Sequence, residues 1–83
     1  MSRRARCALH ALEKARPASG FRPETEEEWA RLQAAQLNYF AVMLEETQDL
    51  SRSEAERVAR IVFGGIAGRV ILEAAFREEE PRP

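Results

Sequence analysis

Apolar residues recur at helical spacing in the C-terminal third of the chain, residues 51–80, and their distribution changes partway along it. Up to about residue 60 they occupy one side of the predicted helix, and arginines occupy another. From Ile61 onward the predicted helix has two roughly opposite apolar stripes, and a single neighbouring helix covers only one of them. We therefore expect a second chain or a partner to dock here. One stripe contains Phe63, Ala67, Val70 and Ala74, and the other contains Ile61, Gly65, Gly68 and Leu72.

A capping box predicts where the preceding helix begins. Thr25 is followed three residues later by Glu28, a spacing that lets a hydroxyl and a carboxylate satisfy the free backbone donors of a helix start. The apolar residues that follow fall within one arc of the helix surface, whereas Arg31, Asn38 and Glu45 lie opposite and are expected to face water. The pattern predicts a helix from residue 26 to about residue 47.

A second capping box, from Ser51 to Glu54, follows after a turn over residues 48–50. Because this connection is short, the two helices are expected to lie side by side and antiparallel. The predicted fold is all-α: a long antiparallel helical hairpin forms a body over residues 23–83, preceded by a short basic N-terminal helix or arm over residues 1–22. A lone core of this size is marginal, so we expect two hairpins to pair into a dimeric four-helix bundle.

Residues 1–16 fit a short amphipathic helix, because Ala5, Leu9 and Leu12 fall on one face. An isolated helix of this length is marginal in water, so it must dock on something. The Pro, Ala, Ser and Gly of residues 17–20 predict a linker, in which Phe21 is expected to anchor the crossing to the body.

Charge divides the chain into a basic arm and an acidic body. The whole chain has a net charge of −1. Residues 1–22 carry six basic side chains against Glu13, whereas residues 23–83 carry seven arginines against 13 acids. Such an arm can bind nucleic-acid phosphates or an acidic partner. It can also lie on its own body or on the body of a partner subunit, and we favour this interpretation. The residues available for phosphate or acidic-partner contacts are Arg3, Arg4, Arg6, Lys14 and Arg16.

Three glycines within five residues, Gly64, Gly65 and Gly68, are unusual inside a predicted helix, because each costs about 1 kcal/mol relative to alanine. Two explanations fit. Glycines spaced by four permit close approach of helices, and adjacent glycines permit a helix break near residue 64. A phosphate-binding loop is excluded because no glycine-rich nucleotide-binding motif is present. DNA recognition after a break is disfavoured, since that segment offers only Arg69 and Glu73 as charged side chains before residue 77.

The sequence shows no catalytic, cofactor or metal motif, and we expect a protein that is not an enzyme. One cysteine, Cys7, and one histidine, His10, cannot form an internal disulfide or a Cys/His zinc site. A nucleophilic Cys7–His10 pair would need an orienting third group and a pocket, so we expect a passive thiol. The longest apolar block, of eight residues, is far shorter than the roughly 20 that span a bilayer. No secretory signal is apparent, and we expect a cytoplasmic protein without membrane contact.

These patterns favour a small non-catalytic protein–protein interaction module, such as an adaptor, regulator or small subunit, that acts as a helical homodimer. The alternative is a nucleic-acid-associated regulator that binds phosphates through its Arg-rich N-terminal arm. An Arg69–Glu73 pair could fix the register at the packed interface or lie exposed to solvent. The predicted partner or oligomer interface consists of Ile61, Gly64, Gly65, Gly68, Leu72 and Phe76.

Overall fold

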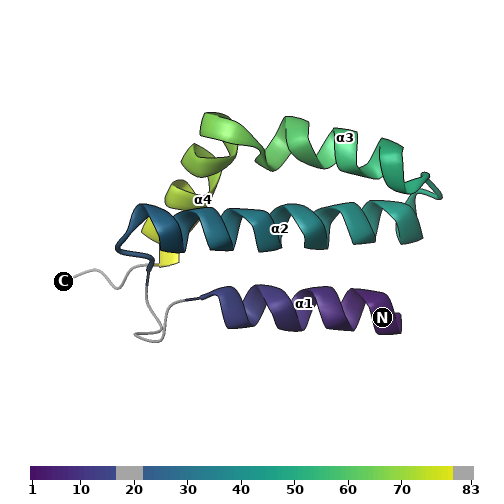
Figure 1. The fold of residues 1–83 in the computed structure, drawn as a ribbon, viewed down its shortest axis with the longest axis horizontal. Coiled ribbons are helices and arrows are strands. Elements are labelled where there is room, and N and C mark those ends of the chain that lie inside the picture. Colours follow the sequence, from purple (N-terminus) through teal and green to yellow (C-terminus); the bar gives the residue numbers. More distant parts are fainter. Residues whose placement is uncertain (17–21, 80–83) are drawn as a thin grey trace.

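Four helices make up most of the described chain (Figure 1). The computed structural model describes residues 1–16 and 22–79, so the predicted linker over 17–20 and the predicted anchor Phe21 lie outside the described residues. Every regular element in the described part is an α-helix, which confirms the all-α prediction. The helices are α1 (Arg3–Ala15), α2 (Glu26–Thr47), α3 (Arg52–Phe63) and α4 (Gly65–Glu79).

Side-chain caps define where the first three helices begin. The Thr25 hydroxyl accepts a hydrogen bond from the backbone N–H of Glu28, and α2 spans the predicted residues. At the start of α3 the predicted capping box forms completely: Ser51 Oγ accepts from the Glu54 N–H, and the Glu54 carboxylate accepts from the Ser51 N–H. Ser2 caps α1 by accepting from the N–H three residues later. Each cap contributes about 1 kcal/mol, so these starts are set by local sequence.

The long helix α2 is the centre of the fold. Helices α1 and α3 lie antiparallel to it on either side, so the three run alongside one another (Figure 1). No α-carbon of α1 lies within 8 Å of one in α3. Helix α4 leaves the direction of α3 and packs against the N-terminal half of α2 (Figure 1). The basic N-terminal segment therefore lies on its own body, as favoured by the sequence.

The second arm of the predicted hairpin is not one continuous helix, because a break at Gly64 separates α3 from α4. Gly64 is extended, with φ −88° and ψ 155°, and its N–H still donates to the Arg60 carbonyl. Gly65 then takes a φ of +61°, in the left-handed region that costs other residues about 1–2 kcal/mol. The two adjacent glycines thus change the chain direction within two residues. Of the two explanations for these glycines, the helix break is confirmed.

Alanine dominates the buried positions between α2 and its two flanking helices. Ala5 and Ala8 are buried between α1 and α2, and Ala41, Ala55 and Ala59 are completely buried between α2 and α3. Small side chains let helices approach closely, but each buries little apolar area. The bulkiest buried side chains gather where α4 meets α2, and residues of α1 pack against them. This cluster contains Trp29, Leu32, Leu72 and Phe76, with Leu12 and Ala15 of α1 at its edge.

Candidate functional site

Helix α4 has two apolar faces, and the chain itself covers one of them. Gly68, Leu72 and Phe76 are buried, with Leu72 7% and Phe76 5% exposed. Phe76 meets Trp29 edge to face, with the ring centroids 5.6 Å apart. Half of the predicted interface residues therefore have a partner within the chain. Of the others, two are the glycines of the break, and Ile61 presents its side chain to solvent.

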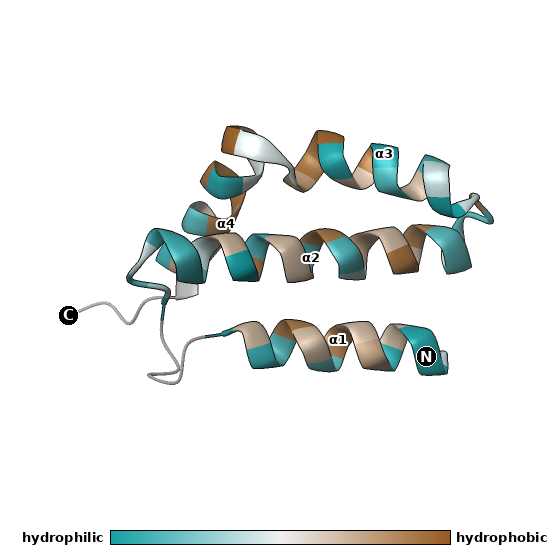
Figure 2. Cartoon of the chain, in the orientation of Figure 1, coloured by the Kyte–Doolittle hydropathy of each residue, from teal (hydrophilic) through white to brown (hydrophobic). Residues whose placement is uncertain are grey.

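Large aliphatic side chains remain in solvent on the opposite face of α4 and at the end of α3. Ile66 is 85% exposed, Ile61 73%, Val70 54% and Ile71 43%. Ile66 and Val70 are one helical turn apart, Ile71 is next to them, and Ile61 precedes the break. Figure 2 shows apolar segments on both sides of this break. We call these four residues the elbow surface.

The sequence did not identify Ile66 and Ile71 as part of this surface. The predicted stripes assume one continuous helix, whereas the break separates Ile61 and Phe63 of α3 from the stripe residues of α4. On any helix through residues 65–79, Ile66 and Ile71 lie on either side of Val70, and Leu72 lies on the other side. The periodicity alone groups these residues, but it does not say whether this face or the Leu72 face is covered.

One side chain from α2 holds the break in place. Gln33 Nε2 donates to the Phe63 carbonyl at 2.7 Å and to the Gly65 carbonyl at 2.8 Å. The Phe63 carbonyl ends α3, where the helix offers it no partner, so Gln33 satisfies an acceptor that would otherwise be free. Gly68 packs closely against the same group, since a Cβ at this position would lie 1.9 Å from the Phe63 oxygen. The elbow is therefore a built turn, fixed by side-chain and backbone contacts.

Arg69 joins the start of α4 to the start of α2. Its guanidinium pairs with Glu73 at 2.7 Å, which confirms the predicted pair, and with Glu26 at 2.6 Å. The same group lies over the Trp29 ring, 4.5 Å from its centroid. The hydrogen bond from Arg69 lowers the pKa of the Glu26 carboxyl group. These contacts hold α4 so that its outer apolar face stays in solvent.

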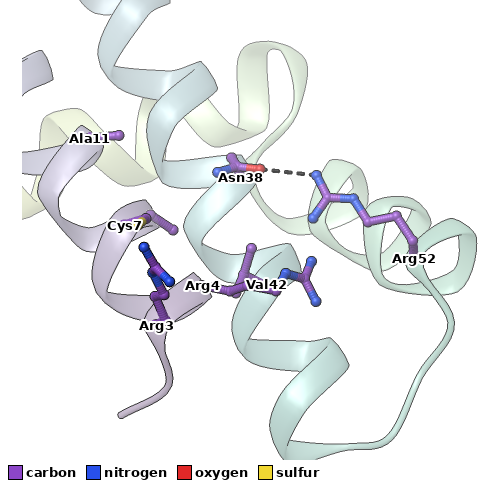
Figure 3. Close-up of a pocket in the computed structure, with 8 residues that line it drawn as sticks. Arg3, Arg4, Cys7, Ala11, Asn38, Val42 and Arg52 are labelled. Carbon is purple, nitrogen blue, oxygen red and sulfur yellow. Dashed lines mark hydrogen bonds between the residues drawn. The ribbon is translucent and has the colours of Figure 1, made fainter.

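A groove of ≈ 550 Å³ lies between α1 and α3 (Figure 3). The α-carbons of α1 and α3 stay more than 8 Å apart, and residues of α2 line the groove between them. Its α2 residues, Asn38 and Val42, lie on a different side of that helix from Trp29 and Leu32, which face α4. The groove is lined by Ala8, Ala11 and Val42, by Asn38 and the exposed Cys7, and by Arg3, Arg4 and Arg52.

The carboxylate of Glu45 links α1, α2 and α3 beside this groove. Its Oε2 accepts from Arg4 at 2.9 Å and from Arg52 at 3.0 Å. Arg52 also donates to Asn38 at 2.9 Å (dashed in Figure 3) and to Glu56 at 2.8 Å. The Glu45 side chain is 13% exposed, so the expectation that it faces water is wrong, because α1 brings Arg4 to it. Hydrogen bonds from Arg52 and then Arg4 lower the pKa of Glu45.

Acid is expected to weaken the attachment of α1 and α3 to α2 through Glu45. Because its folded-state pKa is lowered, its ion pairs contribute stability above the ordinary glutamate pKa of about 4.3 and lose it as the pH falls from there through the folded value. Glu45→Gln should therefore be less stable than the wild type at neutral pH and approach it in strong acid. Urea denaturation followed by circular dichroism at both pH values measures this difference.

Glu27→Gln is the matched control for this acid experiment. The Glu27 carboxylate lies 4.0 Å from Arg31 on an exposed helix surface, where such pairs contribute little. The effect of Glu27→Gln on the free energy of unfolding should change less with pH than the effect of Glu45→Gln. An equal change in the two variants would contradict a special contribution from Glu45.

The basic residues of the predicted phosphate-binding arm point in different directions. Arg3 and Arg4 line the groove, whereas Arg6 and Lys14 are exposed elsewhere on α1. The Arg16 guanidinium lies over an aromatic ring of α4, 5.4 Å from its centroid. The structure therefore divides the arm between intramolecular contacts and solvent, and nucleic-acid binding by it stays a prediction.

Within residues 1–16 and 22–79, no group of three or more His, Cys, Asp or Glu side chains is placed to hold a metal ion. None of the described helices combines the length and the apolar character needed to cross a membrane. The chain matches no protein-family model, no curated protein and no solved structure. The elbow surface and the groove are therefore the features on which a functional interpretation rests.

Proposed function

We propose that the protein is a small non-catalytic interaction module, an adaptor, regulator or small subunit, that forms a homodimer through its elbow surface. The observation that carries this proposal is the exposure of three isoleucines and a valine around a turn that is itself rigidly held. Aliphatic side chains of this size are normally buried, and a group of them rimmed by polar residues is typical of a protein interaction site.

A second copy of the chain is the occupant that the small core favours. Among the described residues, five of the six buried side chains between α2 and its flanking helices are alanines, and the larger apolar side chains there are only partly buried, so the core of each chain is small. Burying one large aliphatic side chain contributes about 1.5–3 kcal/mol. A two-fold interface buries the same four side chains on both chains. The free energy gained by burying them is of the same order as the roughly 4–15 kcal/mol that association costs.

This dimer differs in its contacts from the predicted pair of two-helix hairpins. Each chain now contributes four helices of its own, and Leu72 and Phe76 remain in the internal core. The proposed interface keeps Ile61 and adds Ile66, Val70 and Ile71 on the outer face of α4. Contact between the elbow surfaces leaves the internal packing of each chain unchanged.

The double variant Ile66→Glu/Val70→Glu is expected to convert the dimer to a monomer. Both side chains are exposed in the single chain, so the substitutions should leave the helix content unchanged while placing charge in the interface. Light scattering after gel filtration should give twice the 9.4 kDa chain mass for the wild type and the chain mass for the variant.

Gln48→Glu/Ser53→Glu is the matched control, because it adds the same charge at exposed positions near the turn between α2 and α3, far from the break. This control should remain dimeric. A wild-type protein that is monomeric at micromolar concentration would overturn the homodimer. A double elbow variant that remains dimeric would show that the chains meet through another surface.

A further inference from the structure

We propose that the groove between α1 and α3 binds an acidic amphipathic helix of a partner protein. None of its lining residues belongs to α4 or to the elbow surface, so a partner helix and a second copy of the chain could bind at different places. The open space lies where α1 and α3 flank α2 with their α-carbons more than 8 Å apart. A further helix laid along α2 would contact all three.

The charge of the groove favours an acidic occupant. Arg3 and Arg4 approach from α1 and Arg52 from α3, so positive charge stands on both sides (Figure 3). Within the described residues Arg3 makes no ion pair, while the side chains of Arg4 and Arg52 keep 58% and 43% of their surface exposed despite their bonds to Glu45. Arginine has five N–H donors in a fork that matches carboxylates. Donors therefore remain available for carboxylates that enter from solvent.

The floor of the groove favours a helix with a narrow apolar edge. Ala8 and Ala11 of α1 and Val42 of α2 are small or medium-sized apolar residues that line the groove together with the arginines. The lining residues of α1 run from Arg3 to Ala11, which is about 12 Å, or two helical turns. Amphipathic helices bind such grooves by laying their apolar face on the floor, with flanking charges against the rims. The occupant therefore needs small apolar residues at helical spacing, with Glu or Asp beside them.

A nucleic acid fits this surface less well than an acidic helix. Glu45 and Glu56 accept hydrogen bonds from the groove arginine Arg52, and Glu46 accepts one from Ser2 at the start of α1. A phosphate backbone carries closely spaced charge along its whole length, so these carboxylates would repel it. Separate carboxylates on a helix can be spaced to meet the arginines and avoid the glutamates. The apolar floor also offers nothing to a phosphate.

Alkylation of Cys7 provides a direct test, because it is the only cysteine in the sequence and lines the groove. The probe is a stapled synthetic helix of about four turns, with alanine and leucine on one edge and glutamates flanking it. Bound peptide should slow the reaction of Cys7 with iodoacetamide, followed by mass spectrometry. The same peptide with glutamine in place of every glutamate should protect Cys7 much less.

Variants on the two sides of α1 test whether the groove arginines are responsible. Arg3→Gln/Arg4→Gln should weaken protection by the acidic peptide about tenfold, because charge-assisted bonds to both arginines are lost. Arg6→Gln/Lys14→Gln removes the same charge outside the groove and should retain protection. Circular dichroism of both variants verifies that α1 remains folded.

Four outcomes would overturn the proposal. The first is failure of the acidic peptide to protect Cys7, and the second is an equal loss of protection in both pairs of substitutions. Protection that rises with protein concentration in the absence of peptide would assign the groove to a second copy of the chain. Stronger protection by a single-stranded DNA oligonucleotide than by the peptide, lost on addition of salt, would assign it to nucleic acid.

Discussion

Phe76→Ala is expected to lower the free energy of unfolding by about 3–5 kcal/mol, the cost of removing a buried phenylalanine side chain. The Phe76 ring is 5% exposed and meets Trp29 edge to face. It belongs to the cluster that contains the bulkiest buried side chains among the described residues, whereas the buried members of the other two clusters are mostly alanines. A chain of this length is stable by only about 4–12 kcal/mol. The substitution therefore removes a large part of the total free energy of unfolding, and α4 should detach from α2.

Two measurements separate detachment of α4 from global unfolding. Trp29 is the only tryptophan in the sequence and lies against Phe76, so its fluorescence reports on the α2–α4 contact. Circular dichroism reports on all four helices. In Phe76→Ala we expect the fluorescence change to occur at a lower urea concentration than in the wild type. The helical circular dichroism signal should either be smaller from the start or be lost at a higher urea concentration than the fluorescence change.

Phe76→Leu and Val58→Ala are the controls for this prediction. Phe76→Leu keeps much of the buried volume and should cost far less than alanine, because similar-sized apolar substitutions usually cost less than about 1.5 kcal/mol. Val58 is 36% exposed on α3, so its replacement by alanine should cost about 1 kcal/mol or less. A loss of under about 1 kcal/mol for Phe76→Ala would show that the α2–α4 contact contributes little to the fold.

Local chemistry explains why the helix starts could be predicted. The N-cap at Thr25 and the complete capping box at Ser51 act within four residues, and both helices begin where the sequence places them; at Thr25 the Glu28 carboxylate accepts from the Thr25 hydroxyl and not from its backbone N–H. The length of α2 and its antiparallel pairing with α3 also follow from short-range features, namely a continuous apolar arc and a short turn. The docking of α1 on the body was favoured for a physical reason, since a short isolated helix is marginal in water.

The covered face of α4 could not be predicted, because both of its faces are apolar. Periodicity identifies a buried face only when the opposite face is polar. Leu72 and Phe76 were therefore assigned to an interface with another chain, although Trp29 and Leu32 pack against them within the chain. The choice depends on the direction that the chain takes at Gly65, and a contact from Gln33 some 30 residues earlier helps to set that direction.

The groove could not be predicted for a related reason. Its arginines come from α1 and α3, which meet opposite sides of α2 and have no contact that a sequence pattern could reveal. Glu45 looked like a solvent-facing residue because it lies opposite the apolar arc of α2. Its carboxylate bonds with Arg4 and Arg52 arise from the way three helices are assembled. Long-range ion pairs of this kind follow from the tertiary fold and leave no local signal.

Gly68→Ala is the substitution for which helix propensity and the structure predict changes of opposite sign in the free energy of unfolding. In a continuous helix, replacing glycine with alanine stabilises by about 1 kcal/mol. Here a Cβ would lie 1.9 Å from the Phe63 carbonyl oxygen and 2.7 Å from Gln33 Nε2. The carbonyl belongs to the backbone, so it can move only if the break opens and the Gln33 hydrogen bonds are lost. We expect a destabilisation of about 2–4 kcal/mol, since overpacking typically costs 1–3 kcal/mol and lost hydrogen bonds add to it.

Gly65→Ala separates this steric effect from the effect of backbone conformation. A Cβ at Gly65 meets no atom within 4 Å, so its cost comes from the positive φ alone, about 1–2 kcal/mol. Urea denaturation should therefore rank the wild type first, Gly65→Ala second and Gly68→Ala last. If both variants were more stable than the wild type, residues 52–79 would form one straight helix. In that case Leu72 and Phe76 would be free to meet a second chain, and the elbow surface would no longer be defined by a break.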